Sequence, residues 1–172
     1  MEITTLRLEH EAALREFVDD FARASEAEVP ALLVDLSLPH GEIVDLLDAW
    51  GRGERLQPGW VPGSTWFLEA GGRLLAVANL RHRLTESLER YGGHVGYSVR
   101  PSERGKGYGT LLLDAVKEKA RELGLRRLLV TCAPDNPASQ RVIEKCGGVF
   151  QDESYFVPAN RRVRRFWIEL GP

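Results

Sequence analysis

The stretch that most constrains the fold of this chain is residues 93–110, which read GHVGYSVRPSERGKGYGT. Val95, Tyr97 and Val99 alternate with smaller or more polar residues, and this alternation predicts a half-buried strand. Pro101 ends the strand, because proline has no N–H to give to a neighbouring strand. A glycine-rich loop and the start of a helix follow. A strand, a glycine loop and a helix in this order form an anion site, since free backbone N–H groups and the helix dipole favour negative charge there.

The spacing of the glycines distinguishes between known phosphate-binding loops. Gly105, Gly107 and Gly109 are evenly spaced by two, which does not fit the dinucleotide pattern Gly-x-Gly-x-x-Gly, and Lys106 is misplaced for a Walker A loop. The pattern that fits is Arg/Gln-x-x-Gly-x-Gly, met by Arg104, Gly107 and Gly109. A glycine-rich turn that caps an ordinary helix would explain the same residues. The strand before the loop and the helix after it favour the anion site.

This loop resembles the acetyl-coenzyme A loop of the GNAT family of N-acetyltransferases. In that family the strand before the loop is splayed from its neighbour, and its free backbone groups hold the pantetheine arm. The resemblance therefore implies that Ser98 and Val99 contact the pantetheine. It covers residues 64–150 in order and spacing, whereas residues 1–63 agree with the family only in the number of helices. Within the family, the sequence looks like a bacterial branch of predicted acetyltransferases.

A second signature of the family opens the last helix with Asn, followed by a small residue three positions on, an aromatic seven on and Gly eleven on. Asn136, Ser139 and Gly147 match it, but Ile143 stands where the family commonly has a tyrosine. Asn is also a preferred helix cap, so Asn136 has a purely structural explanation. Its place directly after a predicted strand favours contact with pantetheine.

The resemblance implies acetyl-CoA as the cosubstrate, and we expect no metal site. The residues expected to contact the coenzyme are Ser98, Val99, Arg104, Gly105, Lys106, Gly107, Tyr108, Gly109, Thr110, Asn136 and Ser139. The two cysteines, Cys132 and Cys146, match no metal-binding spacing and are too few for a disulfide framework. We expect them to be buried free thiols in a reducing cytoplasm.

The remaining patterns alternate between strand and helix. A right-handed crossover through the helix after the glycine loop makes the apolar run at 127–131 parallel to the strand before it. The predicted strands are 3–8, 64–70, 73–80, 93–100, 127–131, 149–157 and 162–170. The predicted helices are 9–24, a second that follows the break at 39–41 and carries apolar residues from Ile43 to Trp50, 107–123 and the helix opened by Asn136. Together with the resemblance, this order predicts an α/β acyl-CoA N-acyltransferase (GNAT) fold, with a mixed central sheet of six to seven strands flanked by about four helices.

The 172 residues are most simply one N-acetyltransferase domain, with its core motifs in residues 64–150. Hydrophobic residues make up 43% and charged residues 28%, as in ordinary soluble proteins, and no apolar run is long enough for a membrane span. The first residues lack the features of a signal peptide. We therefore expect a cytoplasmic protein.

The net charge of −2 hides an asymmetry between the two parts of the chain. Residues 1–50 hold 12 acids and 3 arginines, a balance of −9, so residues 51–172 carry +7. A basic C-terminal part suits a polyanionic coenzyme, and an acidic N-terminal part suits a cationic amine, although a solvated helix surface would also explain it. Nucleic acid binding is not supported, because no basic patch interleaved with aromatic residues stands out apart from the C-terminal tail.

Acetylation of an amine requires a base to remove a proton, and the departing thiolate benefits from an acid. His94 on the central strand and Glu86 in the polar connection before it are the candidate bases; the pKa of histidine suits this role near neutrality. Tyr155 is a candidate acid, together with Tyr97 and Tyr108. Each of these side chains also has a structural explanation, since tyrosines commonly bury their rings and a lone histidine on a strand is often simply packed.

The predicted function is transfer of the acetyl group of acetyl-CoA to an amine of a small molecule or peptide. Two alternatives remain open. One is a transferase that uses a longer acyl-CoA. The other is a non-catalytic acyl-CoA-binding or regulatory module, which the replacement of the usual tyrosine by Ile143 makes plausible. A homodimer is left open, and neither nucleic acid nor a membrane is expected as a partner.

Overall fold

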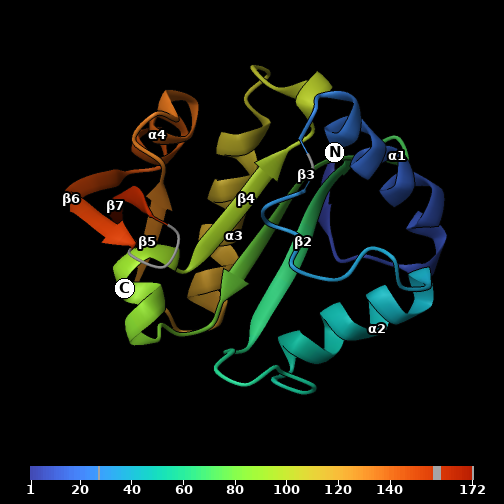
Figure 1. The fold of residues 1–172 in the computed structure, drawn as a ribbon, viewed down its shortest axis with the longest axis horizontal. Helices are drawn as coiled ribbons and strands as arrows, with labels where there is room; N and C mark the ends of the chain where they lie inside the picture. Colours follow the sequence, from blue (N-terminus) through green and yellow to red (C-terminus); the bar gives the residue numbers. More distant parts are fainter. Residues whose placement is uncertain (27, 157–159, 172) are drawn as a thin grey trace.

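The computed structural model describes residues 1–26, 28–156 and 160–171. Its strands are β1 (Glu2–Thr4), β2 (Gly63–Ala70), β3 (Arg73–Arg81), β4 (Val95–Val99), β5 (Arg127–Cys132), β6 (Gly148–Phe156) and β7 (Arg161–Glu169). Its helices are α1 (Glu11–Arg23), α2 (His40–Gly51), α3 (Tyr108–Glu122) and α4 (Pro137–Lys145), with short 3-10 turns at Leu8–His10 and Pro101–Glu103 and a π turn at Leu88–Gly92. Figure 1 labels the longer elements.

The strands form one mixed sheet of seven in the order β1-β2-β3-β4-β5-β7-β6. Neighbouring strands are antiparallel except β4 and β5, which are parallel and are joined through α3. Parallel neighbours need a crossover connection, and the helix after the glycine loop supplies it. The predicted α/β class, the sheet of six to seven strands and the four helices are confirmed.

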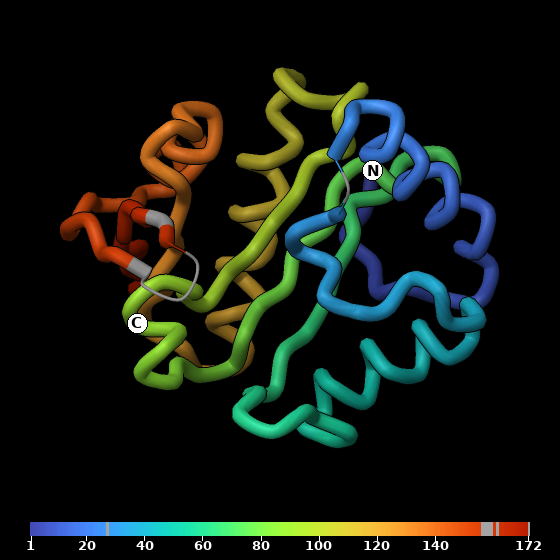
Figure 2. Tube along the Cα trace, viewed as in Figure 1, coloured from blue at the N-terminus to red at the C-terminus, as the bar shows by residue number. Residues whose placement is uncertain are grey.

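Each face of the sheet is covered by its own pair of helices and has its own apolar core. Helices α1 and α2 pack against β2 and β3, with Phe17, Phe21 and Phe67 at the centre of that core. Helices α3 and α4 cover the opposite face, around residues such as Leu112 and Ile143. Figure 2 traces the two helix pairs on either side of the strands.

The sheet opens between β4 and β5. Their register contains one pair, Val95 with Val130, and the His94 N–H donates to the Leu129 carbonyl beside it at 2.7 Å. Gly93, at φ 65°, allows this close approach, because a Cβ there would lie 2.6 Å from the Leu129 oxygen. Beyond Val95 the ladder between the two strands stops while β4 stays paired with β3. The splay that the family resemblance implied is thus present.

The predicted first strand was too long. The residues at 3–8 alternate, but the sheet pairing ends at Thr4. The Arg7 N–H donates instead to Nδ1 of His10 at 3.2 Å, and this bond turns the chain into the 3-10 turn that precedes α1. Residue 157, the predicted end of another strand, lies outside the described residues.

A buried polar contact fastens α1 to the chain that follows β4. Oδ2 of Asp20 accepts the Ser102 N–H at 2.9 Å and lies 3.5 Å from Nε of Arg100. Arg100 and Asp20 are both buried. The N-terminal layer, meaning residues 1–50 with α1 and most of α2, is therefore joined to the segment that leads into the glycine loop.

Both cysteines are buried free thiols, and burial raises the pKa of each, to about 12 for Cys146. Within the described residues, no helix is long and apolar enough to cross a membrane. The same residues contain no cluster of three or more His, Cys, Asp or Glu side chains arranged to hold a metal ion.

Candidate functional site

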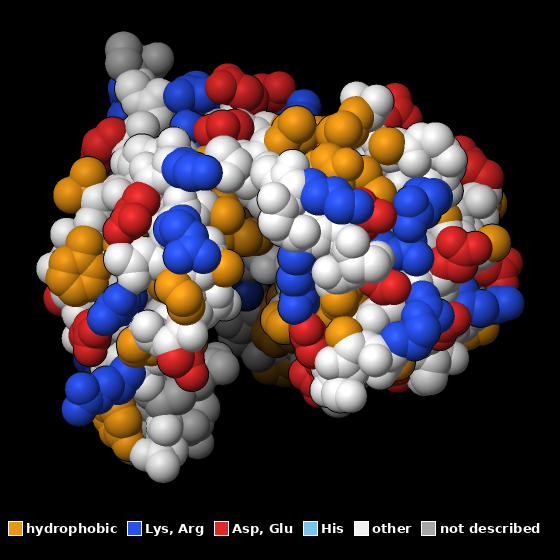
Figure 3. All heavy atoms as spheres, turned by 90° about the horizontal axis from the view of Figure 1, so that it is seen from above, with side chains coloured by type: hydrophobic (Ala, Val, Ile, Leu, Met, Phe, Trp, Pro, Cys, Tyr) orange, Lys and Arg blue, Asp and Glu red, His pale blue; other side chains and the backbone are white. Residues whose placement is uncertain are grey.

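A cleft of about 610 Å³ opens where β4 and β5 diverge. Seen from above, the surface is hollowed between two lobes (Figure 3). One wall comes from β4, the glycine loop and helices α3 and α4, and the other from the segment around α1. The residues that line the cleft are Phe21, Glu26, Pro30, Tyr97, Ser98, Val99, Arg104, Gly105, Gly107, Tyr108, Gly109, Thr110, Asn136, Ala138, Ser139, Arg141, Val142 and Lys145.

The structure brings together at this cleft every residue expected to contact the coenzyme except Lys106. The ammonium of Lys106 instead bonds Oε2 of Glu103 at 2.7 Å, beside the loop. Sequence reasoning missed Arg141 and Lys145, two exposed cations on α4 that line the cleft. Their spacing of four placed them on one helix face, and this signal was available once the helix was predicted.

The glycine loop ends at the N-terminus of α3 in the conformation that an anion site needs. Gly107 is the residue before the helix and has φ 87°, in the left-handed region. A Cβ built on Gly107 meets nothing within 4 Å, so the loop surface there is open. The first N–H groups of α3 have no carbonyl partner within the helix and carry its positive dipole end. Backbone donors at this position suit a phosphate or pyrophosphate group.

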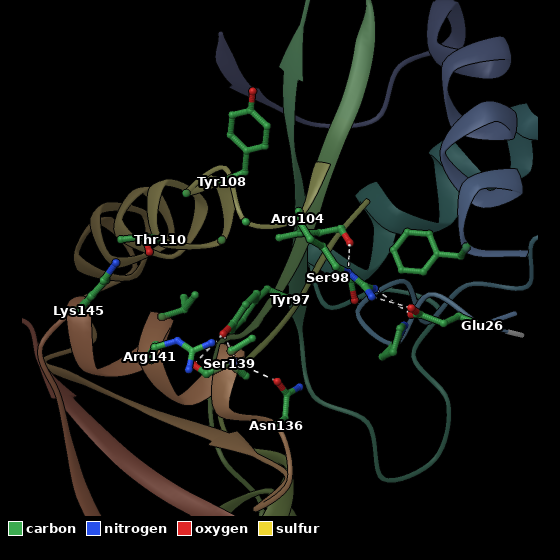
Figure 4. Close-up of a pocket in the computed structure, with 18 residues that line it drawn as sticks. Glu26, Tyr97, Ser98, Arg104, Tyr108, Thr110, Asn136, Ser139, Arg141 and Lys145 are labelled. Carbon is green, nitrogen blue, oxygen red and sulfur yellow. Dashed lines mark hydrogen bonds and ion pairs between the residues drawn. The ribbon is translucent and has the colours of Figure 1, made fainter. Parts of the chain in front are cut away.

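Tyr97 on β4 reaches across the splay to the start of α4. Its hydroxyl lies 2.8 Å from Oγ of Ser139, and the Ser139 N–H donates to Oδ1 of Asn136 at 3.0 Å (Figure 4). Asn136 therefore caps α4 and lines the cleft at the same time. Burial raises the pKa of Tyr97 to about 12, so its hydroxyl keeps its proton at neutral pH.

Ile143 does not face the cleft. Its side chain is fully buried in the core beneath α3 and α4, and Val142 beside it lines the cleft instead. A hydroxyl that lines the cleft beside α4 comes instead from another element of the same wall, from Tyr97 on β4. A sequence comparison along α4 alone could not have found it.

An ion pair crosses one end of the cleft. Both terminal nitrogens of Arg104 donate to the Glu26 carboxylate, at 2.6 and 2.8 Å, and its Nε donates to the Val99 carbonyl at 3.2 Å (Figure 4). The hydrogen bond from Arg104 lowers the pKa of Glu26. The guanidinium also lies over the ring of Phe21, 5.8 Å from its centroid. Glu26 and Phe21 belong to the N-terminal layer, which the sequence patterns did not connect with the loop.

His94, the first candidate base, lies at the closed end of the splay. Its Nδ1 accepts the Leu129 N–H at 2.9 Å, and its ring packs edge-on to Trp167. Burial, together with the positive charges of Arg81 and Arg127, lowers the pKa of His94 to about 4. The side chain is 6% exposed and does not line the cleft.

Glu86 and Tyr155 also lie outside the lining of the cleft. The Glu86 carboxylate is exposed to solvent and accepts a hydrogen bond from Arg90 at 2.6 Å. Tyr155 is on β6, half exposed, with its hydroxyl bonded to Asn160. The structure therefore does not bring His94, Glu86 and Tyr155 together, and their catalytic roles stay predictions.

The fold is thus that of an α/β protein whose cleft lies beside a splayed pair of parallel strands, closed at one end and leading through a glycine loop into a helix. The sequence profile of the acetyltransferase (GNAT) family matches residues 38–148 of this chain. The chain belongs to that family.

Curated relatives align with less than half of the chain. An uncharacterized N-acetyltransferase of Bacillus subtilis is 30% identical over 76 residues, which are 44% of this chain and 44% of that protein. The L-2,4-diaminobutyric acid acetyltransferase of Nocardia farcinica is 32% identical over 80 residues, 45% of this chain and 39% of that protein. The chain thus spans less than half the length of the curated relatives it matches.

Solved structures share the fold over nearly the whole chain. An acetyltransferase from Salmonella typhimurium, solved with its cofactor acetyl-CoA, has a TM-score of 0.64 at 17% identity, covering 98% of this chain and 93% of that one. The spermidine N-acetyltransferase of Vibrio cholerae has a TM-score of 0.64 at 15% identity, covering 99% and 95%. At these identities the likeness establishes the fold alone.

Proposed function

We propose that this chain is an acetyl-CoA-dependent N-acetyltransferase that acts on an amine of a small molecule or peptide, as one domain over residues 1–172. The observation that carries the proposal is the free edge of β4 beside the glycine loop. Beyond Val95 this edge offers a pantetheine arm backbone groups that pair with no neighbouring strand, and the N-terminus of α3 offers donors to a pyrophosphate. Arg141 and Lys145 add positive charge along the same cleft.

Acetyl-CoA supplies an activated thioester, and the chain must orient it, deliver a proton and exclude competing water. Backbone groups of β4 and the loop hold and orient the coenzyme. Tyr97, one of the candidate acids, fits the task of holding a proton near the departing sulfur, because its hydroxyl lies in the cleft and stays protonated. The amine gives up its proton to a base or to an ordered water as nitrogen attacks the carbonyl carbon and the carbon–sulfur bond breaks.

The candidate bases differ in how well their positions fit that role. A base must come within hydrogen-bond reach of the proton that it removes, directly or through one water. His94 is buried at the closed end of the splay with Nδ1 already used, which favours a role in holding β4 to β5. The Glu86 carboxylate is exposed and already accepts a hydrogen bond from Arg90, so it would need a water or a movement of its segment to reach the cleft. We propose that water in the cleft takes the amine proton and relays it to bulk solvent.

The acceptor amine is the finer part of the proposal. The relatives named above act on L-2,4-diaminobutyric acid and on spermidine, both cationic amines, and the N-terminal layer of this chain is acidic. These observations support a cationic acceptor. Longer acyl-CoA substrates and a purely coenzyme-binding role remain the alternatives, and a homodimer stays a prediction.

The test is a thiol-release screen with acetyl-CoA and purified protein against diamino acids, polyamines, aminoglycosides and peptide N-termini. Calorimetry with coenzyme A alone runs in parallel. We expect binding of the coenzyme and amine-dependent thiol release with at least one cationic class. Binding without release for any amine or acyl chain would favour the coenzyme-binding module. No binding at all would overturn the proposal.

A further inference from the structure

The side chain of Arg104 bridges the two walls of the cleft. One of its contacts is the carbonyl of Val99 on β4, and the other is the carboxylate of Glu26 in the N-terminal layer. Figure 4 shows the pair, with dashed lines running from Arg104 to Glu26 in the N-terminal segment. Because 78 residues separate Arg104 from Glu26, this contact exists only in the folded chain.

The Val99 carbonyl belongs to the free edge of β4. The next residue, Arg100, donates its N–H to Leu75 on β3 at 2.9 Å. Backbone groups of successive residues in an antiparallel pair point to alternate sides, so those of Val99 point away from β3 and into the gap beside β5. These are the groups that the proposed function assigns to the pantetheine arm. Arg104 therefore covers part of the coenzyme site with its own side chain.

The same guanidinium is also the group on the loop best suited to a pyrophosphate. Arginine stays charged at all working pH values and binds phosphate oxygens with the same two-pronged geometry that it uses here on a carboxylate. A single carboxylate charge and a doubly charged pyrophosphate then compete for one guanidinium. The two side chains are 48% and 36% exposed, and exposed ion pairs are weak enough to exchange.

We propose that the Arg104–Glu26 pair is an internal competitor of coenzyme A, which must displace Arg104 from Val99 and Glu26 in order to bind. Glu26 therefore lowers the affinity of the cleft for the coenzyme without touching it. The inference rests on the proposed function, because it assumes that coenzyme A is the ligand. It adds that the N-terminal layer controls access to a site built by the other wall.

The experiment is a double-mutant cycle on coenzyme A binding, measured by calorimetry at low salt with wild type, Glu26→Gln, Arg104→Gln and the double variant. Glutamine at 104 keeps the Arg/Gln-x-x-Gly-x-Gly pattern of the loop. We expect Glu26→Gln to bind coenzyme A about fivefold more tightly than wild type, the equivalent of ~1 kcal/mol for an exposed ion pair. In the Arg104→Gln background, the same change should give no such gain.

Glu28→Gln is the matched control, because Glu28 is an exposed acid on the same segment and its removal changes the net charge equally. Weaker or unchanged binding in Glu26→Gln would overturn the inference, since the pair would then clamp the coenzyme or ignore it. A gain of equal size in Glu28→Gln, or in the Arg104→Gln background, would overturn it in favour of a general charge effect. If neither wild type nor Glu26→Gln binds coenzyme A, both the proposed function and the inference fail. If wild type binds coenzyme A but the effect of Glu26→Gln does not depend on Arg104, only the inference fails.

Discussion

The two ends of β4 differ in their contact with the neighbouring strand β5, although β4 is only five residues long. At Val95 it is paired with β5, and the His94 side chain and backbone both bond to Leu129 next to it. At Val99 the carbonyl finds no strand partner and accepts a hydrogen bond from Arg104. Because the pairing between β4 and β5 stops after Val95, the residues of β4 that hold the sheet together are separate from those available to a ligand. The predictions below test that division.

The largest effect is expected at the closed end, in the pH dependence of stability. Because the pKa of His94 falls from 6.5 to about 4 on folding, the unfolded chain binds the proton more readily. The contribution of His94 to the free energy of unfolding is therefore fully present above about pH 6.5. It is lost as the pH falls to about 4, and this loss lowers the free energy of unfolding by at most about 3 kcal/mol. Urea unfolding from pH 8 to 4 measures the loss.

The comparison variant for this prediction is His94→Asn, whose side-chain oxygen can still accept the Leu129 N–H but does not titrate. It should show a flatter dependence on pH between 6.5 and 4, and its turnover at neutral pH should stay within about twofold of wild type. A well-folded His94→Asn enzyme slowed by about 10²-fold or more would instead support the role of His94 as the base.

At the open end, the expected effect is on coenzyme affinity. Gly107→Val forces a β-branched residue into φ 87° and puts its side chain on the open loop surface. Loss of one or two hydrogen bonds to a charged phosphate should weaken coenzyme A binding by about 100-fold, as measured by calorimetry.

Gly124→Val provides the matched control, since Gly124 follows α3 at φ 80° with nothing within 4 Å of its Cβ. Both variants should lose a similar amount of stability, about 1–2 kcal/mol, to the left-handed conformation. Unchanged affinity in Gly107→Val would remove the loop from the coenzyme site.

Tyr97→Phe should have a smaller effect, on turnover. A coenzyme A thiol has a pKa near the ordinary value of about 8.5, so its thiolate can depart partly unaided. We expect kcat to fall about tenfold, below the usual 10²–10⁴ for a general acid, with little change in coenzyme affinity. Ser139→Ala, which removes the hydroxyl's partner, should cost less. An unchanged kcat of Tyr97→Phe at all pH values would contradict the role of Tyr97 as an acid and leave its ring only a packing role.

The smallest effect concerns the acidic N-terminal layer. If the acceptor is a cationic amine, its KM should rise about two- to threefold as salt screens the surface charge of residues 1–50. Initial rates at two ionic strengths measure this effect. A neutral analogue of the same amine serves as the control, and an equal rise for both would contradict steering by charge.

The sequence predicted the open end of β4 far better than the closed end. The strand, the glycine loop, the helix and Asn136 follow local rules of spacing and capping, and the structure brings them to one cleft. His94 could not be assigned from its neighbours in sequence, because its partners Leu129 and Trp167 reach it only through pairing of distant strands. The 3–8 strand was overextended because alternation says nothing about the side-chain bond that ends it.

Contacts between segments far apart in the sequence could not be predicted from the sequence either. Glu26 has the sequence surroundings of any helix-end acid, and its position over the loop depends on how α1 packs and on the Asp20–Ser102 contact. The charge imbalance pointed to the acidic half of the chain without indicating which acid faces the cleft. Ile143 stands at the motif position of the usual tyrosine, yet its side chain is buried and does not line the cleft.

The burial of the two cysteines bears on how the reaction can be followed in real time. Aromatic disulfide reagents react with thiolates, and Cys132 and Cys146 are buried with their pKa values raised. Native protein should therefore contribute almost no colour of its own, and each equivalent of coloured product reports one released coenzyme A. For the same reason both thiols should react slowly with peroxide, and oxidation of these sulfurs should not change the rate of the reaction.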